Sequence, residues 1–137
     1  MIKIVKLIVE PFGLNIDVFV NVKTEIDLQN IRTYIESENT VLEDFEFSED
    51  DLHLNGSYYY FNCQEGIYRC IFLREFKQSS ISDIQNITHE LYHALVHILD
   101  QVEIKTNDKF NELMAYLLDC NLGKFLTAIK IKNYEKL

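Results

Sequence analysis

The clearest helical signal in the chain is the stretch SISDIQNITHELYHALVHILD, residues 80–100. On a helical wheel with 100° per residue, most of its aliphatic side chains fall within one arc of about 140°. His93 lies about 40° and Glu90 about 100° from His89, on the other side of the wheel. The stretch therefore predicts an amphipathic helix that packs its aliphatic arc inward and presents its histidines to a cleft.

Five residues of this helix, His89-Glu90-Leu91-Tyr92-His93, form an HExxH pattern. Histidines at positions i and i+4 lie about 6 Å apart along the axis, so both imidazoles can reach one zinc ion. The glutamate beside the first histidine can take a proton from a zinc-bound water, whose pKa the metal lowers. We therefore expect Zn²⁺ at His89 and His93, with Glu90 as the general base.

A catalytic zinc site needs a third protein ligand, and this ligand has to come from another element. His97 continues the i, i+4 series, but it lies about 12 Å along the helix from His89, so the two cannot share one ion. A second helical pattern begins near Asn107 or Asp108, either of which supplies its N-cap, and Glu112 is the best candidate ligand on it. The narrow polar strip of this second helix consists of Glu112, Tyr116, Asp119 and Gly123.

Upstream of the two helices the apolar residues recur with a period of two, which predicts strands. We expect strands at residues 2–9, 15–22, 58–63 and 68–76, a short helix at 25–35, an acidic edge strand within 36–51, and a capping box at Ser82 and Gln85. Strands followed by helices predict an α+β fold with an N-terminal, mostly antiparallel sheet. The strand at 68–76 is expected to bind an extended peptide at the sheet edge.

Length and charge limit the classes of function. The chain has 137 residues, a hydrophobic fraction of 47% and a net charge of -9, which predict a single domain, residues 1–137, that does not bind nucleic acid. Three cysteines without a CxxC pair argue against a disulfide framework. The apolar N-terminus is too short to span a membrane, so we expect a cytoplasmic protein. The oligomeric state stays open.

The two helices together resemble a known group of enzymes. HELYH followed by NELMAYLLDCNLGKFL resembles the gluzincin pattern, and HELYHALVHILDQVEI with NDKFNELMAYL is similar to small phage-encoded zinc peptidases of the minigluzincin type. HELYHALVH also resembles the helix of the ImmA/IrrE family, peptidases of mobile elements. The resemblance covers about residues 81–130. It implies a zincin-like fold, a peptide or protein substrate, zinc ligands at His89, His93 and Glu112, and Glu90 as general base.

The chain departs from the gluzincin pattern around the site. Many gluzincins carry an aspartate four residues after the glutamate ligand, where this chain has Tyr116, with Asp119 one turn further on. Tyr116, Asp119 and His97 are therefore expected near the site rather than as ligands. Larger gluzincins also have a downstream residue that stabilises the tetrahedral intermediate. Tyr134 is a weak candidate for that role, which stays unassigned.

Three functions are compatible with the sequence. The first is a minimal zinc-dependent metallopeptidase that hydrolyses peptide bonds with metal-activated water. The second is a non-catalytic phage or mobile-element protein that keeps a zincin fold, with or without zinc, to bind a partner. The third is a metal-free interaction module in which the HExxH pattern is accidental.

Overall fold

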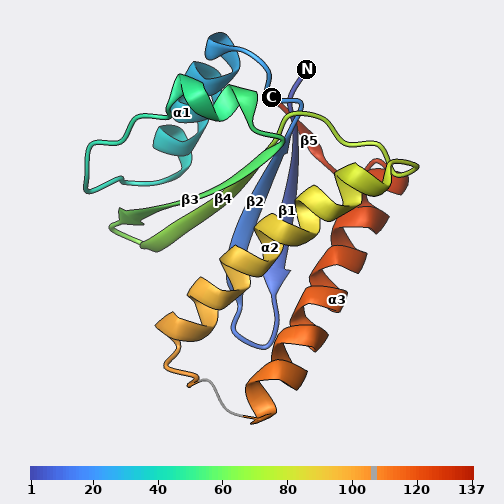
Figure 1. The fold of residues 1–137 in the computed structure, drawn as a ribbon. Helices are drawn as coiled ribbons and strands as arrows, with labels where there is room; N and C mark the ends of the chain where they lie inside the picture. The colour runs from blue at the N-terminus through green and yellow to red at the C-terminus, as the bar shows by residue number, and fades with distance from the viewer. Residues whose placement is uncertain (106–107) are drawn as a thin grey trace.

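A five-stranded sheet separates one helix from two long helices in the computed structural model, which describes residues 1–105 and 108–137 (Figure 1). The elements are β1 (Lys3–Val9), β2 (Leu14–Val20), α1 (Glu25–Glu38), β3 (Gly56–Cys63), β4 (Gly66–Leu73), α2 (Ile81–Gln101), α3 (Asp108–Lys130) and β5 (Glu135–Lys136), with a 3₁₀ turn at Glu49–His53 before β3. The α+β prediction is confirmed. None of the helices in the described part of the chain is long and apolar enough to cross a membrane.

The sheet has the order β3-β4-β2-β1-β5 and is mixed. Three of its pairings are antiparallel, whereas β2 and β4 run parallel with Asp17 opposite Cys70. Parallel neighbours need a crossover connection, and here α1 and the edge strand β3 both lie between β2 and β4 in the chain. The sheet is therefore mostly antiparallel, as expected, but the sequence analysis did not include the parallel β2–β4 pairing.

Each face of the sheet covers its own hydrophobic core. Val18 and Val20 of β2 pack on the side of α2 and α3, and Phe19 between them packs on the side of α1. This alternation follows from the opposite orientation of successive side chains in a strand. Because β2 is buried on both faces, it anchors the two helical layers to one another.

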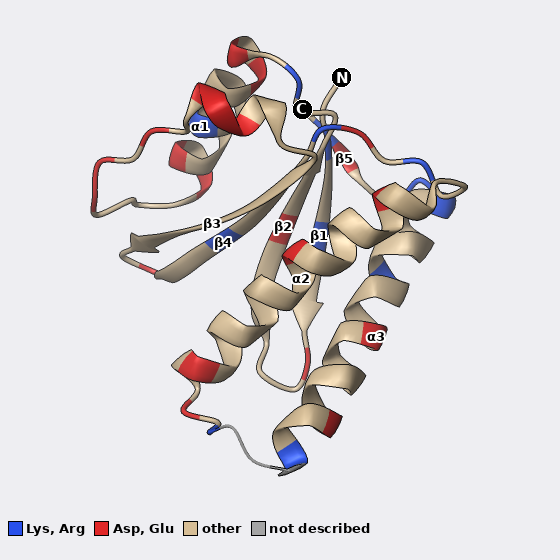
Figure 2. Cartoon of the chain, viewed as in Figure 1, with Lys and Arg blue, Asp and Glu red and all other residues tan. Residues whose placement is uncertain are grey.

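The acidic stretch 36–51 is not the strand that its alternation predicted. α1 continues to Glu38, and beyond it Val41 makes only an isolated bridge to Cys63. The ring of Phe45 lies 4.2 Å from that of Phe61, and the ring of Phe47 lies 4.7 Å from that of Phe72. The two phenylalanines anchor an irregular segment to the α1 core, while its carboxylates stay in water. Figure 2 shows these acidic residues gathered around α1.

The start of α2 also differs from the prediction. The helix is capped by Ser80, whose hydroxyl accepts the backbone N–H of Asp83, rather than by Ser82. The Asp83 carboxylate accepts the backbone N–H of Lys77 at 2.9 Å, so it fastens the loop before the helix. Of the two predicted N-cap residues of α3, Asn107 lies outside the described residues and Asp108 is the first residue of the helix.

Candidate metal centre and adjoining groove

His89 and His93 lie together on the exposed face of α2. Their Nε2 atoms are 3.0 Å apart, and their ring centroids are 4.6 Å apart. Two nitrogens bound to one tetrahedral zinc ion at about 2.0–2.1 Å are about 3.3 Å from each other. The pair is therefore within a few tenths of an ångström of the separation that a shared ion requires. Without an ion, the same distance fits a hydrogen bond between the two imidazoles.

Glu90 lies next to the pair but is directed toward the sheet. Its side chain is buried, and burial raises the pKa of its carboxyl group, while the two histidines oppose that shift. β3 approaches α2 closely here, since a Cβ atom on Gly56 would lie 3.1 Å from the Glu90 Cγ. Sequence reasoning missed Gly56, and a glycine opening a tyrosine-rich strand is the only signal that could have indicated it.

The structure does not bring Glu112 to the two histidines. Among the described residues, no group of three His, Cys, Asp or Glu side chains is arranged to hold a metal ion. Glu112 is exposed on α3, as are Tyr116 and Asp119. In Figure 1 the first half of α3, which carries Glu112, diverges from the second half of α2. Glu112 as a zinc ligand therefore stays a prediction.

A groove of about 570 Å³ adjoins the histidine pair, between α2 and β3. The Tyr58 hydroxyl lies 2.8 Å from Nδ1 of His97, and the ring centroids of Tyr60 and His97 are 4.2 Å apart. His97 thus contacts β3 through Tyr58 and Tyr60. The groove is lined by Tyr58, Tyr60, Glu90, His93, Val96, His97 and Asp100.

The sheet edge beside this groove is β3, not the strand at 68–76 that was expected to bind peptide. β4 lies between β3 and β2 and has no free edge. At the far end of β3, the backbone of Asn62 faces outward: its C=O accepts the N–H of Leu42 and its N–H donates to the Glu43 carboxylate. Because this orientation repeats every second residue, the backbones of Tyr60 and Tyr58 face the same open edge.

Beneath the groove lies an arginine that the sequence analysis did not single out. Arg69 of β4 is only 2% exposed and stands opposite Tyr60 in the β3–β4 pairing. Its guanidinium lies near the Tyr58 hydroxyl, whose pKa is raised by burial and lowered by Arg69, and its Nε and Nη2 atoms have no hydrogen-bond partner among the described residues. Burial lowers the pKa of Arg69. The one available signal was a single cation within the apolar run of β4.

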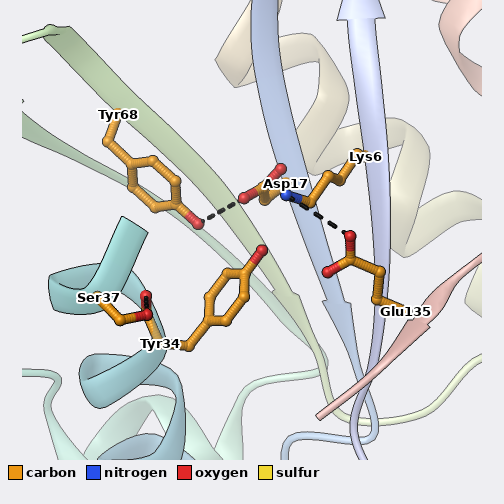
Figure 3. Close-up of polar contacts among 6 residues, drawn as sticks. All are labelled: Lys6, Asp17, Tyr34, Ser37, Tyr68 and Glu135. Atoms are coloured by element: carbon orange, nitrogen blue, oxygen red, sulfur yellow. Dashed lines mark hydrogen bonds and ion pairs between the residues drawn. The ribbon is translucent and has the colours of Figure 1, made fainter. Parts of the chain in front are cut away.

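A second polar cluster lies on the opposite, α1-facing side of the sheet (Figure 3). The Tyr68 hydroxyl donates to the buried Asp17 carboxylate at 2.8 Å, and Lys6 Nζ lies 3.8 Å from a carboxylate oxygen of Glu135. The Tyr34 hydroxyl, Asp17 and Glu135 all raise the pKa of Lys6. The sequence analysis assigned these residues no role in the site.

In comparisons with protein-family models, curated proteins and solved structures, nothing matches the chain. Function therefore has to be argued from the geometry of the site.

Proposed function

We propose that this chain is a minimal zinc-dependent peptidase. The observation that carries the proposal is the 3.0 Å separation of the His89 and His93 Nε2 atoms on an exposed helix face, directly beside Glu90. Imidazole nitrogens are favoured zinc ligands, and a helix packed along its other face holds them without rearrangement. His89 and His93 would hold the ion, with Glu112 as the predicted third ligand.

Zinc bound there would supply a Lewis acid for a scissile carbonyl and lower the pKa of a coordinated water. Glu90 accepts a proton from the attacking water and returns it to the departing amine, so that the peptide C–N bond is exchanged for a C–O bond. The burial of Glu90 against β3 supports this role. The close approach of Gly56 to the Glu90 Cγ restricts the positions that the carboxylate can take beside the histidine pair.

The edge of β3 supports a peptide as substrate. The outward backbone groups of Tyr58 and Tyr60 can pair with an extended chain by strand addition. Such a chain would run beside the groove that His93 and Glu90 line. The net charge of -9 makes a nucleic-acid phosphate backbone an unfavourable alternative.

A second candidate function is partner binding at the same groove without turnover. It is favoured by one observation: no third ligand joins His89 and His93 among the described residues. In this case a peptide segment of a partner would occupy the edge of β3 and remain uncleaved.

Zinc content and peptide hydrolysis test the proposal together. The zinc-loaded protein is expected to bind one ion per chain and to cleave members of a fluorogenic peptide library. Glu90→Gln should keep the zinc and lose at least a hundredfold in kcat/KM, because the general base is gone. His53→Ala removes an exposed histidine of the 3₁₀ turn and should change neither quantity. Zinc binding without hydrolysis of any library member would favour the partner-binding candidate.

Glu112 needs its own variant because the structure leaves it apart from the pair. If Glu112 is a ligand, Glu112→Gln weakens zinc binding by at least about tenfold, whereas Glu103→Gln, before α3, leaves it unchanged. Equal zinc affinities in the two variants would remove Glu112 from the site while leaving His89 and His93 in it.

A further inference from the structure

The groove beside the histidine pair is lined by two carboxylates, Glu90 and Asp100, and no described lysine or arginine lines it. Glu90 lies at the histidine pair, whereas Asp100 lies near the end of α2. Glu90 is only 8% exposed, and no described residue donates a hydrogen bond to its carboxylate. The groove therefore presents negative charge that the described part of the chain leaves unpaired.

The position of Asp100 on its helix is unfavourable for a carboxylate. Asp100 lies in the last turn of α2, where negative charge opposes the helix dipole and where no basic residue offsets it. The side chain is exposed, and the ion pairs of the described residues lie elsewhere. Helix stability therefore disfavours an acidic residue here, whereas a cation bound in the groove would favour one.

The opposite wall of the groove is aromatic. Tyr60 of β3 is 53% exposed, and its ring centroid lies 4.2 Å from that of His97 on α2. The face of a tyrosine ring attracts a guanidinium or an ammonium group. Val96 adds an aliphatic wall, against which the methylene groups of a long side chain can pack. A carboxylate for the charge and apolar walls for the stem together match an arginine or lysine side chain.

Two cationic groups limit how close to the histidine pair such a side chain can lie. Arg69 is 2% exposed beneath Tyr58, and burial and its charge lower the pKa of His97, which favours the neutral ring. A zinc ion at the histidine pair would be the second cation. Asp100 follows His93 by seven residues, about 10 Å along the helix, which exceeds the Debye length of about 8 Å at physiological salt. The Asp100 end of the groove is therefore the favourable end.

We infer that the Asp100 end of the groove is a subsite for an arginine or lysine side chain of an extended peptide. The Asp100 carboxylate pairs with the cation, and the Tyr60 ring packs against it. The inference rests on the proposed function in one respect, that a peptide lies along the edge of β3. Because an extended chain rises about 3.3 Å per residue, the cationic residue lies about three residues from the bond that is cleaved.

Three blocked heptapeptides that differ at one central residue test the inference. The peptides Ac-Ala-Thr-Ala-X-Ala-Thr-Ala-NH₂ carry arginine, citrulline or glutamate at X, and citrulline has the shape of arginine without its charge. Binding is followed by NMR titration of the zinc-free, ¹⁵N-labelled full-length protein at low ionic strength. We expect the arginine peptide to bind about fivefold more tightly than the citrulline peptide, the size expected for an exposed ion pair with a cation–π contact. The glutamate peptide should bind most weakly, and the amide shifts should centre on Tyr60 and residues 96–100.

Asp100→Asn and Asp44→Asn are matched variants that each remove one negative charge. Asp44 is exposed and lies near Arg32 of α1, so its variant should keep the preference for arginine. Asp100→Asn should reduce that preference to less than twofold, and Asp100→Lys should reverse it in favour of the glutamate peptide. Neither substitution of Asp100 should lower the melting temperature, because the carboxylate opposes the helix dipole.

The outcomes separate this inference from the proposed function. Equal affinities for the arginine and citrulline peptides, an unchanged preference in Asp100→Asn, or amide shifts away from the groove would overturn the subsite. So would the absence of binding by all three peptides. If the arginine preference is present but the zinc-loaded parent cleaves nothing, the inference stands and the peptidase proposal fails. If the zinc-loaded parent cleaves peptides without regard to arginine, the peptidase proposal stands and the inference fails.

Discussion

The two polar clusters on opposite faces of the sheet differ in how their groups are partnered. On the α1 side, Asp17 is buried and bonded to Tyr68, and Lys6 lies among carboxylates and the Tyr34 hydroxyl (Figure 3). On the α2 side, His89 and His93 are exposed and contact each other. In the first cluster Asp17 is partnered by Tyr68 and Lys6 by Glu135, while the buried Tyr34 hydroxyl has no hydrogen-bond partner among the described residues. The second consists of two adjacent imidazoles on an exposed helix face.

This difference separates structural from functional polar groups. Groups that satisfy one another in a buried network contribute to folding, and removing one leaves its partners unpaired. Exposed groups that converge without closing a network contribute little to folding and are free to bind a ligand. The comparison predicts that substitutions in the α1-side cluster change stability and substitutions in the α2-side cluster change ligand binding. A substitution in one cluster should have little effect on the property that depends on the other.

The largest expected effect is on zinc binding by His89 and His93, the α2-side cluster. His93→Ala should weaken zinc binding at least a hundredfold, because it removes one of two convergent imidazoles. The unfolding free energy without zinc should change by less than about 0.5 kcal/mol, since the side chain is exposed. Competition with a chromophoric chelator measures the affinity. A large loss of stability without zinc would mean that the histidine pair is structural.

The next largest expected effect is on stability, in the α1-side cluster around Asp17. Asp17→Ala should lower the unfolding free energy by about 1–3 kcal/mol, because it leaves the half-buried Tyr68 hydroxyl without its hydrogen-bond acceptor. Urea denaturation measures it, with the exposed Asp44→Ala as the matched control. Zinc affinity should not change. If Asp17→Ala altered zinc affinity as much as stability, the two clusters would not be independent.

A smaller effect is expected where β3 meets Glu90. Gly56→Ala places a methyl group 3.1 Å from the Glu90 Cγ, so the carboxylate has to shift, and kcat/KM should fall about tenfold. Gly123→Ala on α3 meets nothing within 4 Å and should raise stability by up to about 1 kcal/mol, because alanine favours a helix. Equal kinetics in the two variants would show that the position of Glu90 does not depend on Gly56.

The smallest expected effect is the pH dependence of stability that Asp17 of the α1-side cluster causes. Burial raises the pKa of Asp17 above 3.8, against the Tyr68 hydrogen bond and Lys6, which lower it. The contribution of protonated Asp17 to the free energy of unfolding is therefore fully present below about pH 3.8. It is lost as the pH rises through the folded-state pKa of Asp17. Asp17→Asn, neutral throughout, should gain stability relative to the parent between pH 4 and 7. A relative loss over that range would mean that the folded-state pKa is lowered.

Sequence periodicity was sufficient for α2, α3 and most strands, because both helices and strands repeat their burial pattern locally. It failed at residues 36–51, where Phe45 and Phe47 insert into the core without forming a strand. It also failed for the parallel β2–β4 pairing. Neither the pairing of strands distant in sequence nor the end point of a crossover is encoded in a local pattern.

For the site, the sequence predicted the neighbouring histidines and Glu90 because all three are on one helix, where spacing determines proximity. It did not indicate Tyr58 or Gly56, which come from β3 and meet α2 only through tertiary packing. The placement of Glu112 depends on how α3 packs against α2. Spacing within a helix does not determine that.

A crystal structure of the zinc-soaked protein, with anomalous scattering collected at the zinc edge, tests the central claim most directly. The account predicts one anomalous peak within about 2.0–2.1 Å of Nε2 of both His89 and His93. It also predicts at least one coordination position left to water. No peak between these two nitrogens in protein soaked with excess zinc, or zinc bound only elsewhere, would contradict it.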